Sequence, residues 1–146
     1  MPAVFKIVSR ASGKALTALG LPEPTGITQL PAIDEYLRFQ SWTLQPLDRA
    51  EDCLIRSFSA PALAIGLNPT DPQSHLLYVG PVDGAQVWRI TPIASPPYFF
   101  LLEGSDDLLI DVPGGSHASN VQIQVSRRNE HTNQQWVFLP VLAELP

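Results

Sequence analysis

Asn133-Gln134-Gln135-Trp136, close to the C-terminal end of the chain, is the stretch that decides the fold. Two earlier segments repeat its pattern of a glutamine two residues before a tryptophan: Gln40-Ser41-Trp42 and Gln86-Val87-Trp88. These are the three tryptophans of the chain, and they are 46 and 48 residues apart. A pattern that recurs every few tens of residues is typical of a repeat architecture. The sequence therefore predicts three equivalent units.

The composition indicates a globular chain built from short strands. Of its 146 residues, 45% are hydrophobic and 16% are charged, which is enough apolar material for one domain with its own core. The 15 prolines and 9 glycines indicate frequent turns, which suit short strands better than long helices. No segment shows a sustained helical period. We therefore predict an all-β fold.

Each predicted unit contains four short strands, and the units cover approximately residues 1–48, 49–94 and 95–146 of a single domain. The twelve predicted strands are residues 4–8, 15–19, 27–30, 42–47, 53–58, 61–65, 76–79, 87–93, 98–102, 108–112, 121–125 and 136–141. Such strands cannot bury a hydrophobic face alone, whereas closing them around a common axis gives one shared core. We expect the three tryptophans in that core, with the neighbouring glutamine amides satisfying backbone groups of turns.

Three Gln-x-Trp segments, each closing a set of four short strands, resemble the ricin B-chain-like β-trefoil lectins over essentially the whole chain. The resemblance implies a β-trefoil that binds galactose or N-acetylgalactosamine-type glycans and is not an enzyme. In that family a repeat can carry an Asp at the end of its second strand, polar and aromatic side chains on its third, and an Asn-Gln pair before the tryptophan. A carboxylate and an amide suit a pair of sugar hydroxyls, and a ring covers the apolar sugar face.

The third repeat keeps most of this set, so the resemblance assigns the sugar site to it. Asp111 takes the place of the carboxylate, and Asn133 takes the place of the amide that grips the hydroxyls. Gln134 is expected to brace the pocket from behind, and Arg127 to add a donor at its rim. The predicted carbohydrate-binding residues are Asp111, Gln122, Gln124, Arg127, Asn133 and Gln134.

The chain departs from the family's pattern at Gln124, where the family usually presents its stacking aromatic ring. His117 and His131 are candidates to replace that ring from a neighbouring loop. Because Gln124 offers an amide in place of this ring, we expect the affinity for sugar and the preference for galactose to differ from those of the family.

The first two repeats match the family's set less well. At the position of the carboxylate we predict Thr17 and Ala64, and at the position of the asparagine we predict Phe39 and Ala85. Tyr78 is a candidate for the aromatic position of the second repeat. We therefore expect one competent sugar site.

The two main site residues have structural alternatives. Asp111 precedes Pro113-Gly114-Gly115, a sequence suited to a tight turn that the carboxylate would stabilise. Asn133 has the alternative of capping turn backbone groups. Asp106-Asp107 is interpreted as a solvated hairpin turn, because a glycosidase needs two carboxylates that converge across a cleft.

Protease inhibition through an exposed loop is the alternative function, because β-trefoils that resemble these lectins in fold include such inhibitors. The candidate loops are residues 21–26, residues 48–52 with Arg49 at their centre, and residues 68–72. Prolines in the first and last of these loops would lower the entropy cost of binding. No Gly-rich phosphate loop, Gly-x-Ser-x-Gly or His-Glu-x-x-His pattern occurs in the sequence.

Charge and cysteine content restrict the partners. The net charge of −5 disfavours nucleic acid and anionic membrane as partners, because both require clustered Lys and Arg. Cys53 is the single cysteine, so an intrachain disulfide is excluded, and we expect it to be a buried apolar residue. The histidines His75, His117 and His131 have no metal-site spacing, and no cofactor is predicted.

The N-terminal residues lack the basic segment and apolar run of a signal peptide, and no segment is long enough to cross a membrane. We therefore expect a cytoplasmic protein. If the chain also forms a homodimer, one site per subunit would still cross-link glycans through avidity.

Overall fold

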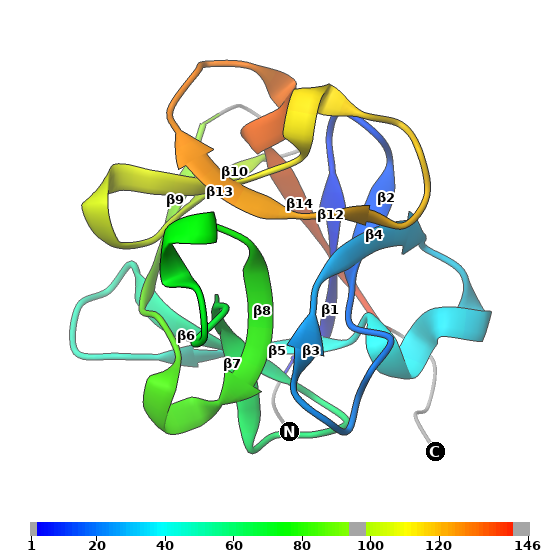
Figure 1. The fold of residues 1–146 in the computed structure, drawn as a ribbon, viewed down its shortest axis with the longest axis vertical. Helices are drawn as coiled ribbons and strands as arrows, with labels where there is room; N and C mark the ends of the chain where they lie inside the picture. The colour runs from blue at the N-terminus through cyan, green and yellow to red at the C-terminus, as the bar shows by residue number, and fades with distance from the viewer. Residues whose placement is uncertain (1–2, 94–98, 142–146) are drawn as a thin grey trace.

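The computed structural model describes residues 3–93 and 99–141. Within these two ranges the regular structure consists of β-strands and short 3-10 helices, and none of these helices could cross a membrane (Figure 1). The strands are β1 (Phe5–Ser9), β2 (Lys14–Thr17), β3 (Thr25–Gly26), β4 (Thr28–Pro31), β5 (Trp42–Pro46), β6 (Asp52–Ser57), β7 (Leu63–Leu67), β8 (Leu77–Pro81), β9 (Trp88–Pro92), β10 (Phe100–Glu103), β11 (Leu108–Asp111), β12 (Val121–Gln122), β13 (Gln124–Arg127) and β14 (Trp136–Pro140). The 3-10 helices are η1 (Asp34–Phe39), η2 (Pro72–Ser74), η3 (Val82–Gly84), η4 (Ser105–Asp107), η5 (Pro113–Gly115) and η6 (Thr132–Gln134). The all-β prediction is confirmed.

Six strands, the first and fourth of each repeat, close into a barrel. The order around it is β1, β14, β10, β9, β6, β5 and back to β1, with every neighbouring pair antiparallel. Closure removes the edge strands that a short open sheet would expose. The remaining strands form one hairpin per repeat, and this barrel with three hairpins is the predicted β-trefoil. Tyr98, the first residue of the predicted strand 98–102, lies outside the described residues.

Each tryptophan is fully buried and anchors its repeat through its indole N–H. The Nε1 atom donates to the backbone carbonyl of a residue near the end of the second strand of the same repeat. The three pairs are Trp42 with Leu16 (3.2 Å), Trp88 with Ile65 (3.0 Å) and Trp136 with Ile110 (3.0 Å). The structural interpretation of the Gln-x-Trp pattern is therefore confirmed for its tryptophans.

These anchors align the repeats and correct one prediction. The residues that follow the three acceptors are Thr17, Gly66 and Asp111. The prediction that Ala64 corresponds to Asp111 is therefore wrong, because the tryptophan and its acceptor are 23 positions apart in the second repeat and 26 in the other two. Strand register agrees, since Gly66 lies opposite Tyr78 as Asp111 lies opposite Gln124.

The third strands of the three repeats meet at the pseudo-threefold axis, near the centre of Figure 1. There the backbone N–H of Ile27 donates to Leu77 O (3.1 Å), that of Leu77 to Ile123 O (2.9 Å), and that of Ile123 to Ile27 O (2.9 Å). The predicted strand 121–125 breaks at Ile123 into β12 and β13, and β3 precedes Ile27 in a segment where no strand was predicted. The twelve predicted strands therefore become fourteen.

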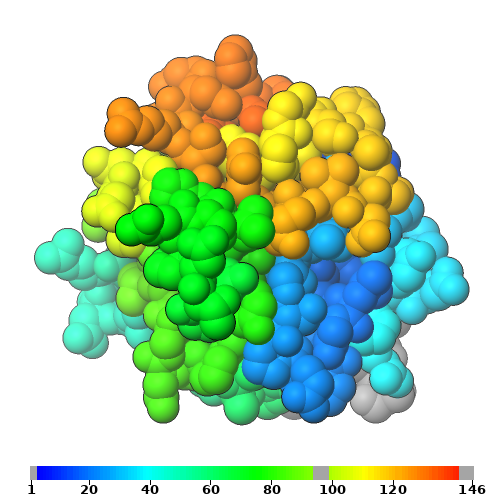
Figure 2. Space-filling view, viewed as in Figure 1, coloured from blue at the N-terminus to red at the C-terminus, as the bar shows by residue number. Residues whose placement is uncertain are grey.

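The side chain of Gln122 reinforces this ring by donating to its three carbonyls. Its Nε2 atom lies 2.8 Å from Ile27 O, 3.1 Å from Leu77 O and 3.1 Å from Ile123 O, so one amide serves all three carbonyls. Gly26 provides the room, because a Cβ there would lie 2.9 Å from Gln122 Oε1. On the face of the molecule formed by the hairpins, the segments of the three repeats meet around this point (Figure 2).

The barrel core is completed by aromatic contacts. Phe138 packs edge-on against Phe5 at 5.8 Å and Phe100 at 5.2 Å between ring centroids. Cys53 takes the corresponding first-strand position in the second repeat, opposite Trp88. It is buried as predicted, and this burial, followed by the charge of Asp52, raises the pKa of its thiol to about 11. The thiol therefore stays protonated and unreactive at neutral pH.

We predict that Gly26 and Gln122 are energetically coupled. Gly26→Ala should lower the free energy of unfolding by about 1–3 kcal/mol, because the tethered Gln122 amide cannot move aside. In a Gln122→Ala background the same change should cost much less, since the clashing atom is gone. Urea unfolding of the four proteins in this double-mutant cycle measures the coupling. Equal costs of Gly26→Ala in both backgrounds would contradict the interpretation.

Candidate functional site

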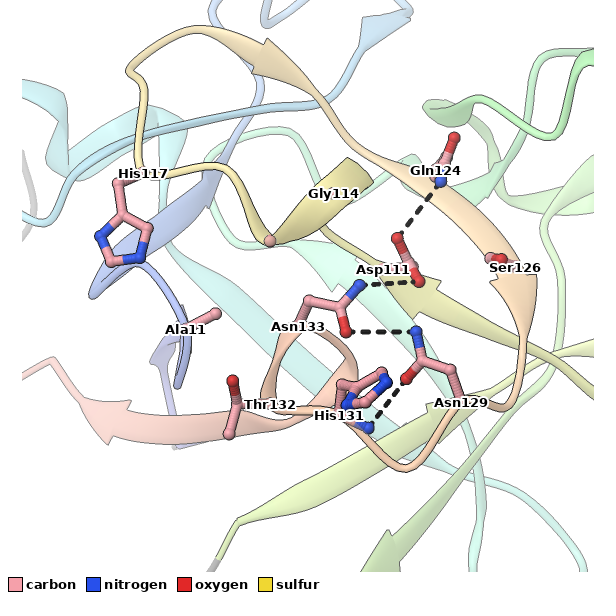
Figure 3. Close-up of a pocket in the computed structure, with 11 residues that line it drawn as sticks. Ala11, Asp111, Gly114, His117, Gln124, Ser126, Asn129, His131, Thr132 and Asn133 are labelled. Carbon is pink, nitrogen blue, oxygen red and sulfur yellow. Dashed lines mark hydrogen bonds between the residues drawn. The ribbon is translucent and has the colours of Figure 1, made fainter.

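A cavity of about 490 Å³ opens in the third repeat, where the end of β11, the strand β13 and the helices η5 and η6 come together. Asp111, Gln124 and Asn133 lie close together in it, and polar side chains from the loop before η6 complete its wall (Figure 3). The residues that line it are Ala11, Asp111, Gly114, Gly115, His117, Gln124, Ser126, Asn129, His131, Thr132 and Asn133.

Asp111 is the chemical centre of this cavity. Its carboxylate is 2% exposed and accepts three amide hydrogen bonds: Oδ1 from Gln124 Nε2 (3.2 Å), and Oδ2 from Asn133 Nδ2 (3.2 Å) and Gln134 Nε2 (3.0 Å). Within residues 3–93 and 99–141, no Lys or Arg forms an ion pair with it. Burial raises the pKa of the Asp111 carboxyl, and the hydrogen bonds from Gln134 and Gln124 offset part of that effect.

Asn133 links this carboxylate to the turn that follows β11. Its Nδ2 atom donates to Asp111 and also to Val112 O (3.1 Å), and its backbone carbonyl accepts from Val112 N (2.9 Å). Its Oδ1 atom accepts from Asn129 Nδ2 at 3.3 Å. Asn133 therefore caps turn backbone, as the structural alternative predicted, and it also lines the cavity.

Gln134 lies behind the carboxylate and does not line the cavity. It is 1% exposed, and its Nε2 atom donates both to Asp111 and to Arg127 O (2.7 Å). In the first repeat Gln40 makes the equivalent pair of bonds, to Thr17 Oγ1 (3.0 Å) and Pro31 O (2.9 Å). The glutamine of the pattern thus ties the second strand to the third wherever the second strand offers a polar side chain.

The second repeat shows what happens when that polar side chain is missing. Gly66 stands at the position of Asp111, so Gln86 has no acceptor there. The Gln86 amide turns outward instead and donates to Ser105 Oγ. Tyr78 does take the position of Gln124, as predicted, but it faces Gly66 and the small side chain of Ala85 rather than a carboxylate and an amide.

The structure does not bring two of the predicted residues to the cavity. Gln122 and Gln124 would share one face of a continuous strand, but the strand breaks at Ile123 and Gln122 turns to the pseudo-threefold axis. The Arg127 side chain is exposed and lines no part of the cavity, and only its carbonyl contributes, as the acceptor for Gln134.

Sequence reasoning missed Ser126 and Asn129, which both line the cavity. Ser126 follows Gln124 by two residues on β13, so the alternation of strand side chains could have revealed it. Asn129 could not be found in this way, because it belongs to the loop after β13 and reaches the site through its bond to Asn133.

The turn beside Asp111 is formed as predicted, by Pro113, Gly114 and Gly115. Both glycines have positive φ, +61° and +64°, which side-chain-bearing residues rarely adopt. His117 and His131, the candidate replacement rings, both line the cavity. No cluster of three metal-ligating side chains occurs in the part of the chain that the structure describes.

No protein-family model matches the chain, and no curated protein matches its sequence. Solved structures do match it. A mosquitocidal holotoxin superimposes with a TM-score of 0.82 at 14% identity over 97% of this chain, which corresponds to 17% of that much longer chain.

Two lectins match along most of their length. The C-half of an earthworm R-type lectin, solved with GalNAc, has a TM-score of 0.69 at 19% identity and covers 96% of this chain and 100% of its own. A ricin B-like lectin of Macrolepiota procera, solved with lactose, has a TM-score of 0.71 at 16% identity and covers 93% and 94%. These TM-scores show a shared β-trefoil fold at sequence identities below 20%.

The raised pKa of Asp111 predicts a pH-dependent contribution to stability. A carboxyl whose pKa is higher in the folded state stabilises the protein most below its unfolded value of 3.8, and this contribution is lost as the pH rises through the folded value. The free energy of unfolding of the wild type, relative to Asp111→Asn, should therefore fall as the pH rises above about 4. Urea unfolding of both proteins at each pH measures this. A difference in the free energy of unfolding that rises with pH would mean that the hydrogen bonds to the Asp111 carboxylate lower its pKa by more than burial raises it.

Proposed function

We propose that this protein is a lectin of the ricin B-like β-trefoil family that binds galactose or N-acetylgalactosamine-type glycans through its third repeat, reversibly and without chemistry. The observation that carries the proposal is the Asp111 carboxylate, held by amides at the floor of an open polar cavity. The β-trefoil lectins solved with GalNAc and lactose support it at the level of the fold.

The hydrogen-bonding groups around Asp111 suit a pair of sugar hydroxyls. A carboxylate offers about four acceptor sites, and three of those on Asp111 are occupied in the free protein. One hydroxyl takes the remaining site. A second hydroxyl displaces the Gln124 amide, whose hydrogen bond to Asp111 Oδ1 is 3.2 Å long. The released amide is then free to form a hydrogen bond with the sugar. Asn133 and Gln134 keep the carboxylate in place throughout.

The cavity also supplies contacts around this centre. Ser126 and Asn129 add a hydroxyl and an amide to its wall. The ring that covers the apolar face of the sugar comes from a loop histidine, since Gln124 occupies the place of an aromatic residue. His131 is the better placed of the two candidates, because it adjoins Asn129 and Asn133 in Figure 3, whereas His117 stands apart from that cluster.

The first two repeats do not take part. Thr17 and Phe39 replace the carboxylate and the asparagine in the first repeat, and Gly66 and Ala85 replace them in the second. The Thr17 hydroxyl already donates to Ala15 O and accepts from Gln40, so at most one acceptor site is left on it, and Phe39, Gly66 and Ala85 have no polar side-chain atom. One site per chain follows, so any cross-linking of glycans requires more than one chain.

We predict that Asp111→Asn weakens binding to lactose by about 10- to 150-fold, because a hydrogen bond to a charged group contributes roughly 1.5–3 kcal/mol. Isothermal titration calorimetry with lactose measures the loss. Asp107→Asn is the matched control: it removes the same charge from an exposed turn of the same repeat, at a positive φ that Asn tolerates.

Equal binding by wild type and Asp111→Asn would contradict the assigned site. Absence of binding to any glycan on an array, by protein whose tryptophans show native fluorescence, would contradict the lectin function itself. Sugar-insensitive inhibition of trypsin-like or cysteine proteases would instead support the alternative function that the loops at 21–26, 48–52 and 68–72 suggested.

A further inference from the structure

A second cavity, of about 280 Å³, adjoins the proposed sugar site. The loop of residues 128–131 separates the two cavities: Asn129 lines the first, Arg128 and Glu130 line the second, and His131 lines both. Arg10, from the turn after β1, forms the far wall of the second cavity. A ligand in the first cavity can therefore extend past His131 into the second.

Arg10 is held ready for an anion. Its Nη1 atom donates to Gln135 Oε1 at 2.7 Å, and its guanidinium carbon lies 4.3 Å from the centre of the Phe99 ring. These contacts fix the plane of the guanidinium but use only one of its five N–H donors. Among the described residues, no carboxylate forms an ion pair with it.

Arg128 adds a second positive charge to the same cavity. It pairs with Glu130, with 3.2 Å between Nε and Oε1, and both side chains are more than half exposed. Such a pair is weak in water and leaves the remaining donors of Arg128 accessible. Two arginines against one glutamate give the cavity a net positive charge in a chain whose net charge is −5.

The corresponding cavity at the next repeat junction has the opposite character. It lies between the second and third repeats, and Ser105 takes the place of Arg10 there. Arg10 and Ser105 are equivalent because each follows by five residues the first-strand residue, Phe5 or Phe100, that lies opposite a tryptophan. Its charged lining residues are Asp52, Arg89, Glu103, Asp106 and Asp107. The basic cavity thus adjoins Gln134 and Gln135 of the third repeat, and an acidic cavity adjoins the equivalent residues Gln86 and Val87 of the second.

We propose that the binding site extends across His131 into this second cavity, and that its preferred ligand is a galactoside bearing an anionic group, a sulfate ester or the carboxylate of a sialic acid, held by Arg10 and Arg128. This inference rests on the proposed lectin function. The planar guanidinium matches the oxygen pairs of both anions, and the fixed orientation of Arg10 reduces the entropy lost on binding.

Calorimetric titration of the wild type with lactose, sulfated lactose and sialyllactose tests the inference. We expect one or both acidic ligands to bind about 3- to 10-fold more tightly than lactose, since one or two partly exposed charge-assisted bonds are gained. The ratio of acidic to neutral affinity should shrink as salt is raised, because exposed charges are screened. Preference for sulfate alone, or for sialic acid alone, supports the inference and identifies the source of the anion.

Single substitutions show which side chains bind the anionic group. In Arg10→Gln and in Arg128→Gln the affinity ratio should fall toward one, whereas Glu130→Gln should raise it by removing the competing carboxylate. Arg127→Gln is the matched control, because it deletes an equal charge from an exposed side chain that lines neither cavity, and it should keep the wild-type ratio. Tryptophan fluorescence checks that each variant is folded.

Equal affinity for lactose and both acidic ligands would overturn the inference and leave the proposed function intact. A preference that survives in Arg10→Gln and Arg128→Gln, or that Arg127→Gln abolishes equally, would also overturn it. Absence of binding to all three ligands would overturn the proposed function together with the inference, so the lactose titration separates the two failures.

Discussion

The ring of backbone hydrogen bonds between Ile27, Leu77 and Ile123 is the constraint on which the rest of the structure depends. Each repeat contributes one donor and one acceptor, so no repeat can complete it alone. To reach the ring, a third strand has to leave its own hairpin, and this need breaks two of the three third strands into shorter pieces. Gln122 then shares its amide among the three ring carbonyls, in space that Gly26 leaves open. The hairpins are thus locked together at the axis, while the tryptophans lock them to the barrel.

The same scaffold positions the cavity of the third repeat. Each tryptophan anchors a carbonyl near the end of its second strand, and the next side chain then points away from the core at a fixed place. That place holds Thr17, Gly66 and Asp111 in the three repeats. The threonine accepts a hydrogen bond from the glutamine of its own repeat, the glycine offers that glutamine no acceptor, and the aspartate adds a buried charge. Burial of this charge raises its pKa, and the hydrogen bonds from Gln134 and Gln124 offset part of that effect.

Much of this architecture could be predicted from the residue pattern. The three Gln-x-Trp segments correctly predicted the threefold repeat, the buried tryptophans and the all-β class, because an indole with a satisfied N–H at equal spacing is a strong local requirement of such a core. The family resemblance implied the pairing of Asp111 with Asn133, whose side chains are joined by a hydrogen bond of 3.2 Å. The prediction for Gln122 assumed a strand that continues straight. The assignment of Ala64 assumed equal spacing in all repeats, which a shorter second repeat contradicts.

The sequence by itself determined the repeat and the core, because these depend on spacing along the chain, and the family resemblance implied the pair of polar residues at the heart of the candidate site. Only the tertiary structure decided what surrounds that pair. It turned Gln122 to the axis, brought Asn129 and His131 from a loop, and set Arg10 from the first repeat beside Arg128 from the third. Those neighbours are joined by closure of the barrel, in which β1 pairs with β14 across almost the full length of the chain. Contacts of that kind leave no periodic trace in the sequence, since they arise only when distant segments share one core.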